Sequence, residues 1–228
     1  MMRRRSTAAE WMDDTAATEA AFAAALADLE RINRMSLAHA PTLRWLDRLV
    51  ARSGAARLSL LDVGAGGGDM LEAIARWGAR RGIVLELAGL DRSPWAARYA
   101  QARGRVARRI TADLFDLAPG ERFDIVVCSL FAHHLRDAEL LRFLRWLEDR
   151  ARLGWLISDL HRHPIPWGFV WAAVRLLRMD PMVVHDSTVS IARGFTRDDW
   201  QRLLAEAEVT AEIRRAFPFR WLVGRIRA

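Results

Sequence analysis

The sequence predicts an α/β fold with a doubly wound sheet of seven strands, N-terminal helices and a helical insertion after the fifth strand. Three observations carry this prediction. An apolar run at 58–63 leads through a glycine-rich turn into an amphipathic segment at 70–77. Apolar runs and helical patterns then alternate, as in sheets wound by helices. The 228 residues, 52% of them hydrophobic, suffice for one domain with a full core.

The glycine-rich turn lies within residues 60–69, Leu-Leu-Asp-Val-Gly-Ala-Gly-Gly-Gly-Asp. Such a turn lets the backbone come close to a ligand, and Asp69 is expected to cap the next helix. A dinucleotide fingerprint requires glycine where Asp69 stands, and a phosphate-binding P-loop requires a lysine, which this chain lacks. The turn therefore favours a cofactor that has a cationic end and no phosphates. The alternative is a glycine turn with no ligand.

The next strands also end in acids. The run 83–90 ends at Asp91, at the spacing where an acid can bind ribose hydroxyls, and Ser93 can cap a helix at 94–103. The alternative role for Asp91 is that of a cap or turn residue. A third strand at about 106–110 leads to Asp113, while Asp116 is a second acid nearby.

Two motifs carry a resemblance to a known family. The pattern D-x-G-x-G-x-G from Asp62 resembles motif I of the class I S-adenosylmethionine-dependent methyltransferases. The run F-D-I-V-V-C-S-L-F-A-H-H-L at 123–135 resembles the ubiquinone- and menaquinone-biosynthesis type of these enzymes, which act on small molecules. The resemblance covers roughly residues 25–228. It implies a Rossmann-like sheet whose last strand runs antiparallel, S-adenosylmethionine as the cofactor and S-adenosylhomocysteine as its product.

The resemblance also implies which residues hold the cofactor. The carboxylate of Asp62 and the turn receive the aminocarboxypropyl end, and Asp91 receives the ribose. Asp113 accepts from the adenine amino group, and the next backbone N–H meets a ring nitrogen. The expected cofactor-binding residues are Asp62, Gly64, Ala65, Gly66, Asp91, Arg92, Asp113, Leu114 and Ser129.

The second half of the chain supplies the expected substrate side. A helix at about 137–152 and a strand at about 154–158 come first. The segment 164–193 is longer than a connection requires, and its aromatic, apolar stretch at 166–179 is helix-like. It is interpreted as a helix packed on the core or as a lid over an apolar or aromatic acceptor. A third interpretation is an interfacial helix whose Arg175 and Arg178 face lipid headgroups. A helix capped by Thr196 and two strands, at 209–215 and 220–224, follow.

The chain is expected to form a single methyltransferase domain, 1–228, with four segments. An N-terminal helical cap at 7–52, with helices at about 16–27 and 41–52, precedes a cofactor-binding core at 56–160. The lid-like insertion spans 164–193, and a C-terminal helix and hairpin span 195–228.

The histidines are candidates for a general base. Methyl transfer requires an aligned nucleophile and exclusion of water, and a phenol or enol acceptor also benefits from a base. Five of the six histidines fall in predicted site segments. Position favours His161 first and His133 second, although structural hydrogen bonding is the alternative role. Metal ligation by Asp159, His161, His163, His185 and Asp186 is a further alternative, but a His-x-His pair is weak support and no metal is expected.

Composition limits the partners. The net charge is +7, yet all 35 basic residues are arginines spread along the chain, which indicates coding bias and solubility, so no nucleic-acid partner is expected. The single cysteine, Cys128, fits a cytoplasmic protein without disulfides. Neither a signal peptide nor a transmembrane segment is expected, because Glu10 soon follows the basic start and the longest apolar stretch is short. Peripheral membrane contact and the oligomeric state stay open.

The sequence therefore predicts methyl transfer from S-adenosylmethionine to a small, partly apolar or aromatic acceptor, such as an oxygen of a phenol or enol in a polyketide- or quinone-like metabolite. The alternatives are a C-methyltransferase of a quinone ring, a catalytically silent cofactor- or partner-binding protein, and an RNA methyltransferase, for which charge is the only argument.

Overall fold

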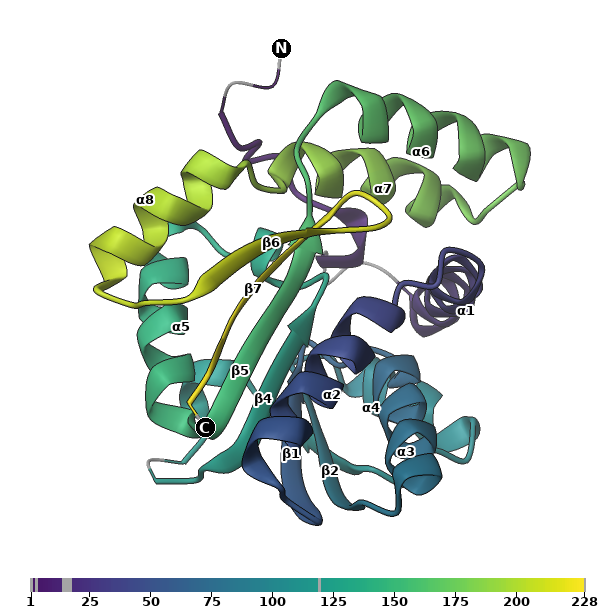
Figure 1. The fold of residues 1–228 in the computed structure, drawn as a ribbon. Helices are drawn as coiled ribbons and strands as arrows, with labels where there is room; N and C mark the ends of the chain where they lie inside the picture. The colour runs from purple at the N-terminus through teal and green to yellow at the C-terminus, as the bar shows by residue number, and fades with distance from the viewer. Residues whose placement is uncertain (1, 3, 14–17, 119, 228) are drawn as a thin grey trace.

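Seven strands form one mixed sheet in the order β3-β2-β1-β4-β5-β7-β6 (Figure 1). The structure is a computed structural model that describes residues 2, 4–13, 18–118 and 120–227. The strands are β1 (Arg57–Val63), β2 (Val84–Asp91), β3 (Arg108–Thr111), β4 (Phe123–Ser129), β5 (Ala151–Leu160), β6 (Glu212–Ala216) and β7 (Arg220–Ile226).

The strand directions confirm the predicted fold class. Strands β1 to β5 pair in parallel, whereas β7 runs antiparallel to both of its neighbours, β5 and β6. The chain order reverses between β1 and β4, which are adjacent in the sheet. In doubly wound sheets, ligands bind beyond the carboxyl ends of the strands at this reversal. The topology thus selects the ends of β1 and β4 as the place to look for a site.

Helices cover both faces of the sheet, with α2 and α3 on one and α5 and α8 on the other (Figure 1). Short 3-10 helices follow β3 and β4. The helices are α1 (Glu19–Met35), α2 (Ala40–Ser53), α3 (Asp69–Arg81), α4 (Pro94–Ala102), α5 (Asp137–Arg150), α6 (Pro164–Leu176), α7 (Pro181–Arg193) and α8 (Arg197–Ala207), with 3-10 helices η1 (Trp11–Asp13), η2 (Leu114–Asp116) and η3 (Ala132–His134).

Each strand divides its side chains between two cores, because successive residues of a strand point to opposite faces. In β1, Leu60 packs in the cluster under α2 and α3, while Leu61 packs under α5 and α8. Both leucines are fully buried. This double burial explains why the parallel strands are continuously apolar in the sequence.

Two helical regions differ from the sequence prediction. Helix α1 extends to Met35 instead of residue 27, because Leu26, Leu29 and Ile32 continue its buried stripe. The residues 14–17 lie outside the described part, including the first two of the expected helix. The insertion 164–193 forms two helices, because Asp180 and Pro181 start a new one: the Asp180 carboxylate accepts from the backbone N–H of Met182 at 2.9 Å.

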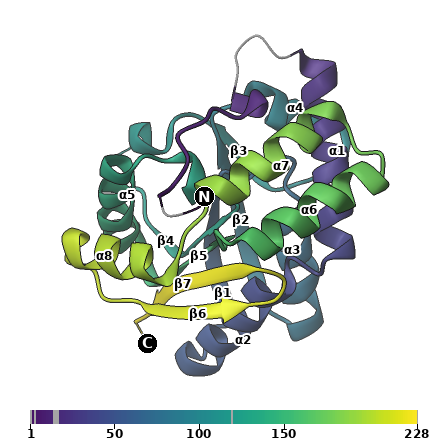
Figure 2. The same cartoon turned by 90° about the horizontal axis from the view of Figure 1, so that it is seen from above.

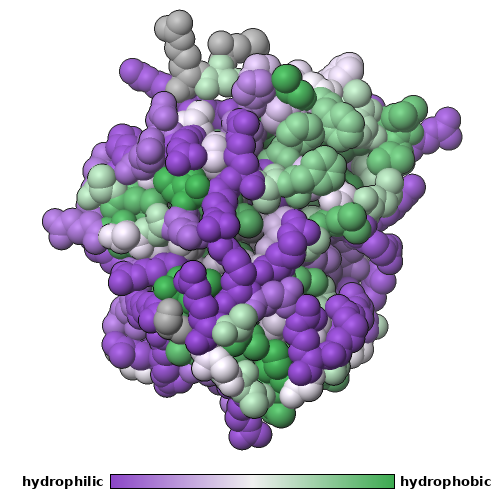
Figure 3. All heavy atoms as spheres, viewed as in Figure 1, coloured by the Kyte–Doolittle hydropathy of each residue, from purple (hydrophilic) through white to green (hydrophobic). Residues whose placement is uncertain are grey.

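Two features lie outside the sheet and its covering helices. Residues 4–13, here called the N-terminal strap, cross the top of the molecule between α5 and α7 (Figure 2). The backbone N–H of Ser6 in the strap donates to Ala192 O at 2.9 Å. Helix α6 packs on α7 and leaves Ile165 and Phe169 more than half exposed. The region of α6 and α7 carries an apolar area at the upper right of Figure 3. The four-segment division of the domain stays a prediction.

None of the helices in the described residues combines the length and the apolar character needed to cross a membrane.

Candidate active site

A cavity of about 310 Å³ lies at the carboxyl ends of β1, β2 and β4. The strap and α1 form its other walls, through residues such as Met12, Phe22 and Leu26. All nine residues expected to bind the cofactor line this one cavity: Asp62, Gly64, Ala65, Gly66, Asp91, Arg92, Asp113, Leu114 and Ser129. Four separate strand ends therefore converge here, as the positions of the acids in the sequence indicated.

The glycine turn is fastened to β2 by backbone and side-chain hydrogen bonds. The backbone N–H of Gly64 donates to Leu90 O at 2.9 Å, and that of Gly66 donates to Asp91 Oδ2 at 2.8 Å. The other oxygen of Asp91 accepts from the N–H of Ser93 at 2.9 Å. Burial raises the pKa of Asp91 despite these donors. Asp91 thus fixes the turn, as a turn residue does, and also lines the cavity, where ribose binding stays a prediction.

Gly64 requires glycine for two independent reasons. Its φ is +71°, in the left-handed region that residues with a side chain avoid. A Cβ atom at this position would also lie 2.5 Å from Cδ2 of Phe131, inside van der Waals contact. The turn is therefore packed directly beneath the segment that follows β4.

Asp62 has a buried carboxyl group with a free oxygen. Only 1% of the residue is exposed, and its Oδ1 has no hydrogen-bond partner among the described residues. Burial, followed by the nearby charges of Asp69 and Asp91, raises its pKa well above the ordinary value. A buried acceptor without a donor is costly, so this oxygen fits the positive end of a ligand that enters the cavity.

Asp69 is not the cap of α3, contrary to the sequence prediction. Gly68 occupies the cap position, and Asp69 is the first residue of the helix. The Asp69 carboxylate instead accepts from Asn33 at 3.0 Å and lies 2.9 Å from Nε2 of His39. Burial opposes ionisation of Asp69, but His39 and Asn33 outweigh it and lower the pKa. The Asp69 side chain contacts Asn33 of α1 and His39 at the start of α2 instead of capping α3. No local sequence pattern indicates these partners.

The two acids after β3 have different positions. Asp113 lines the cavity, and its carboxylate accepts from the N–H of Phe115 at 2.9 Å at the start of η2. Asp116, the competing acid, is not among the lining residues. Arg92 also lines the cavity and forms an ion pair of 2.8 Å with Asp13 of the strap. Asp113 and Arg92 thus both line the cavity, and Arg92 also contacts the strap.

Neither of the predicted catalytic histidines lines the cavity. His133 is 2% exposed, and its Nδ1 lies 2.7 Å from Asp159 Oδ1. His161 packs edge-on against Trp221, and its Nε2 lies 3.4 Å from the guanidinium of Arg215. Burial and then the charge of Arg215 lower the pKa of His161 to about 4. A histidine with this pKa is a weak base at neutral pH.

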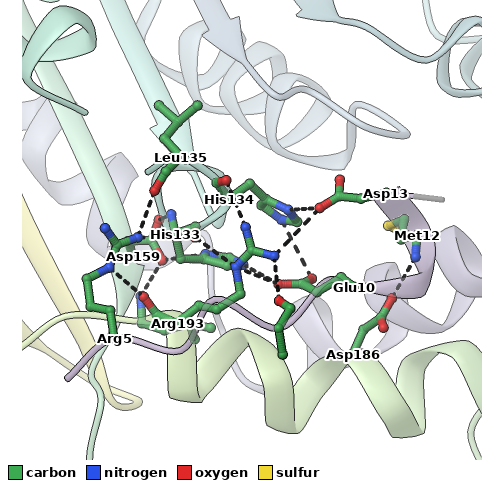
Figure 4. A network of polar contacts seen from close by, with 12 residues as sticks. Arg5, Glu10, Met12, Asp13, His133, His134, Leu135, Asp159, Asp186 and Arg193 are labelled. Atoms are coloured by element: carbon green, nitrogen blue, oxygen red, sulfur yellow. Dashed lines mark hydrogen bonds and ion pairs between the residues drawn. The ribbon is translucent and has the colours of Figure 1, made fainter. Parts of the chain in front are cut away.

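Two histidines line the cavity, His39 and His134. The Nε2 of His39 is engaged with Asp69 at 2.9 Å. The Nδ1 of His134 lies 2.8 Å from Asp13 Oδ2 (Figure 4), and its ring stacks on Phe131 with 6.3 Å between centroids. With Nδ1–H held by the carboxylate, Nε2 keeps its lone pair. His134 is one of the five histidines in the predicted site segments, but its position did not favour it as the base, because the strap residue that orients it lies 121 positions away.

Three groups near the cavity have the chemistry to hold a metal. Ligand atoms of Glu10, His133 and His134 lie within 4.8 Å of one another. However, Arg193 Nε is 3.7 Å from Glu10 Oε1, and the same side chain donates to the carbonyl oxygens of both histidines. This guanidinium already supplies positive charge to the cluster (Figure 4). The expectation of no metal therefore stays a prediction.

The insertion does not supply the walls that a lid would supply. None of residues 164–193 lines the cavity. Helix α7 packs on η1 and η3, and Asp186 accepts from the backbone N–H groups of Trp11 and Met12 at 2.8 and 2.9 Å. The aromatic residues Trp167 and Trp171 of α6 are 38% and 45% exposed. The expectation that they cover the acceptor pocket is not met, because the strap lies between the insertion and the cavity.

Comparison with known proteins gives the family. Residues 30–210 match the model of the family described as "Methyltransferase domain". The chain belongs to this methyltransferase family. The ubiquinone biosynthesis O-methyltransferase of Pseudomonas paraeruginosa is 34% identical over 153 residues, which are 63% of this chain and 61% of that enzyme. The enzyme of the same name from Ruegeria pomeroyi is 32% identical over 173 residues, which are 72% and 64% of the two chains. The methyltransferase chain spans about three fifths of the length of these relatives.

Solved methyltransferase structures share the fold. The plantazolicin methyltransferase BpumL, in complex with a monoazolic desmethylPZN analog and S-adenosylhomocysteine, superposes with a TM-score of 0.65 at 14% identity and covers 90% of this chain and 95% of its own. Human N-acetylserotonin methyltransferase, in complex with S-adenosylmethionine, superposes with a TM-score of 0.63 at 12% identity and covers 92% and 57%. These likenesses establish the architecture of the sheet and its helices.

Proposed function

We propose that the chain transfers the methyl group of S-adenosylmethionine to an oxygen of a small, partly apolar acceptor of phenol, enol or quinol type. The observation that carries this proposal is the convergence of the nine expected cofactor residues on one cavity, together with the unpartnered oxygen of Asp62. Family membership and the named activity of the relatives support it. S-Adenosylmethionine supplies a methyl group already activated by the positive charge on sulfur.

The residues present fit each part of that cofactor. Asp62 Oδ1 lies at the glycine turn and can accept from the ammonium of the aminocarboxypropyl group, which would offset the cost of burying the carboxylate. Asp91 keeps lone pairs for ribose hydroxyls beyond its two backbone bonds. Asp113, which lines the cavity, would accept from the adenine amino group. Because Gly64 has no side chain, a ligand would be able to come close to the turn backbone there.

We assign the general base of this proposal to His134. Its Nδ1 is oriented by Asp13 at 2.8 Å, which leaves Nε2 to take a proton from an acceptor hydroxyl. The carboxylate also stabilises the imidazolium formed when the proton arrives. Glu10 Oε2, 3.7 Å from Nε2, faces the same nitrogen. His133 and Asp159, paired at 2.7 Å, hold η3, which carries His134, against the end of β5 and act as positioning residues.

The walls of the cavity favour an apolar acceptor. Besides the cofactor residues, the lining includes Met12, Phe22, Leu26, Phe131 and Leu135. Such walls exclude water and align a flat acceptor with the methyl group, which is most of what this reaction requires. The acids that also line the cavity, Asp13, Asp113 and Glu139 among them, disfavour a phosphate-rich acceptor such as RNA.

Calorimetric titration with S-adenosylhomocysteine and NAD tests the cofactor, and labelled methyl transfer to phenols, quinols and RNA tests the acceptor. We expect binding of S-adenosylhomocysteine without binding of NAD, and transfer to phenol or quinol oxygen. Asp62→Asn serves as the matched variant, because it removes the negative charge and keeps the side-chain shape. Binding of NAD without binding of S-adenosylhomocysteine refutes the proposal.

A further inference from the structure

A buried arginine at the start of β7 is not used by the function proposed above. Arg220 is 5% exposed and lies opposite Leu160, at the end of β5. Its Nη1 donates to Ser129 Oγ at 3.4 Å, and its Nε has no hydrogen-bond partner among the residues that the structure describes. No carboxylate within the described ranges lies within 4.0 Å of its guanidinium nitrogens. This cation is therefore buried without a counter-charge in contact.

Arg220 belongs to a polar group on one face of the sheet. Residues two apart in a strand share a face, so Ser129, Ser158 and Arg220 lie on the same face as Val127, Leu156 and Leu222 of the core under α2 and α3. Ser129 and Ser158 are neighbours in the register of β4 and β5. Ser158 is fully buried, and within the described part of the chain its Oγ also lacks a hydrogen-bond partner.

This polar group adjoins the cavity. Ser129, which Arg220 contacts, is one of the lining residues, and Asp62 on the same face of β1 carries a third unpartnered buried atom. A protein core seldom leaves several buried polar atoms unsatisfied side by side. A ligand that forms hydrogen bonds with Asp62, Ser158 and Arg220 would account for these atoms.

The charge of Arg220 indicates what kind of ligand. Arginine stays protonated inside proteins, even where burial lowers its pKa to about 10, as it does here. The acids whose charges act on Arg220 are Asp159 and Asp69, and both are engaged, with His133 and His39 respectively. A planar guanidinium fork matches the two oxygens of a carboxylate better than any neutral group.

We propose that Arg220 binds a carboxylate that enters the cavity, with the hydroxyls of Ser129 and Ser158 beside it. The inference rests on the proposed function, because it assumes that the cavity receives a cofactor and an acceptor. The carboxylate has two sources: the α-carboxylate of the cofactor, whose ammonium would meet Asp62, or an acid group on the acceptor. Either source gives the buried cation its missing partner.

The first test measures thermal unfolding of Arg220→Met without ligand. Removing a buried cation that has no counter-charge in contact leaves the melting temperature unchanged or raises it, because an apolar side chain is cheaper to bury. Arg150→Met is the matched control: Arg150 is 7% exposed, but it donates to three backbone carbonyls, those of Leu117, Ala118 and Glu121. We expect the control to melt lower by several degrees. An equal fall in Arg220→Met means a structural role and overturns the proposal.

The second test locates the carboxylate by calorimetry with paired probes. S-Adenosylhomocysteine is compared with 5′-methylthioadenosine, which lacks the amino acid group. In the presence of S-adenosylhomocysteine, 4-hydroxybenzoate is compared with 4-hydroxybenzamide. Arg220→Met is expected to lower the affinity for the acid member of one pair at least tenfold and to spare its neutral partner. Arg220→Lys should recover part of the loss, because it restores the charge without the planar fork.

The outcomes separate this inference from the proposed function. A selective loss for S-adenosylhomocysteine assigns the cofactor's carboxylate, and a selective loss for 4-hydroxybenzoate assigns the acceptor's. If no affinity differs between Arg220→Met and the wild type, the inference is overturned, while the methyltransferase assignment stands. If the wild type binds no S-adenosylhomocysteine, the proposed function fails, and Arg220 is then judged by the hydroxybenzoate pair alone.

Discussion

The replacement of Gly64 by alanine offers a quantitative test of how tightly the glycine turn is packed. Gly64→Ala places a side chain on backbone with φ of +71°, which costs about 1–2 kcal/mol. The new Cβ also overlaps Phe131 at 2.5 Å, and relieving such overlap costs about 1–3 kcal/mol. We therefore expect the free energy of unfolding in urea to fall by about 2–5 kcal/mol.

Gly82→Ala is the control, because Gly82 has nearly the same φ, +67°, and nothing within 4 Å of a built Cβ. It should cost only the backbone part, about 1–2 kcal/mol, and leave the affinity for S-adenosylhomocysteine unchanged. Gly64→Ala should weaken that affinity about tenfold or more, the loss of roughly one hydrogen bond at the turn. The double variant with Phe131→Ala should recover part of the affinity. Equal unfolding free energies for the two single variants, or an unchanged affinity in Gly64→Ala, refute the reasoning.

Four further outcomes are expected. Asp91→Ala should weaken S-adenosylhomocysteine binding by about 1–3 kcal/mol in calorimetry. Asp91→Asn should weaken it by less, because asparagine keeps one acceptor oxygen. Equal losses in the two variants argue against a hydrogen-bonding role of Asp91 in cofactor binding. His134→Gln should lower kcat about a hundredfold without changing cofactor affinity, whereas an unchanged kcat assigns catalysis to proximity alone. Because the folded state lowers the pKa of His161 to about 4, the unfolded state binds the extra proton between pH 6.5 and 4, so stability falls as pH falls through this window. His161→Gln should flatten that part of the curve in urea titrations at several pH values. Finally, a chelator should leave methyl transfer unchanged, because Arg193 already supplies positive charge beside Glu10; loss of activity that zinc or magnesium restores contradicts this.

The parts of the fold that the sequence predicted are those with short-range signals. Buried parallel strands are continuously apolar, and strand ends are marked by acids such as Asp62 and Asp91. Because parallel strands share one carboxyl edge, the positions of these acids along the chain sufficed to bring them to one cavity. Thr196 likewise marked the start of α8, where its capping box with Asp199 is present.

The histidine network could not be predicted, because its members come from three distant segments. Glu10 and Asp13 belong to the strap, His134 follows β4, and Arg193 ends α7. Each is an ordinary polar residue in its local sequence, and only the folded chain brings Asp13 to His134 at the cavity. The aromatic stretch of α6 misled the sequence analysis for the same reason: composition indicates that a segment is apolar, but not which layer it occupies.

The route of the strap also sets the order in which the molecule can assemble. Ser6 bonds to residue 192, and Arg5 bonds to Asp137 and Arg193, so these contacts close loops of more than 130 residues. Loop closure on this scale is slow and comes late in folding. At about 5–20 residues per second, ribosomal synthesis delivers residue 193 roughly 10–40 s after the strap has emerged. The wall of the cavity that carries Met12 and Asp13 is therefore synthesised early but can be fixed in place only after α7 has followed.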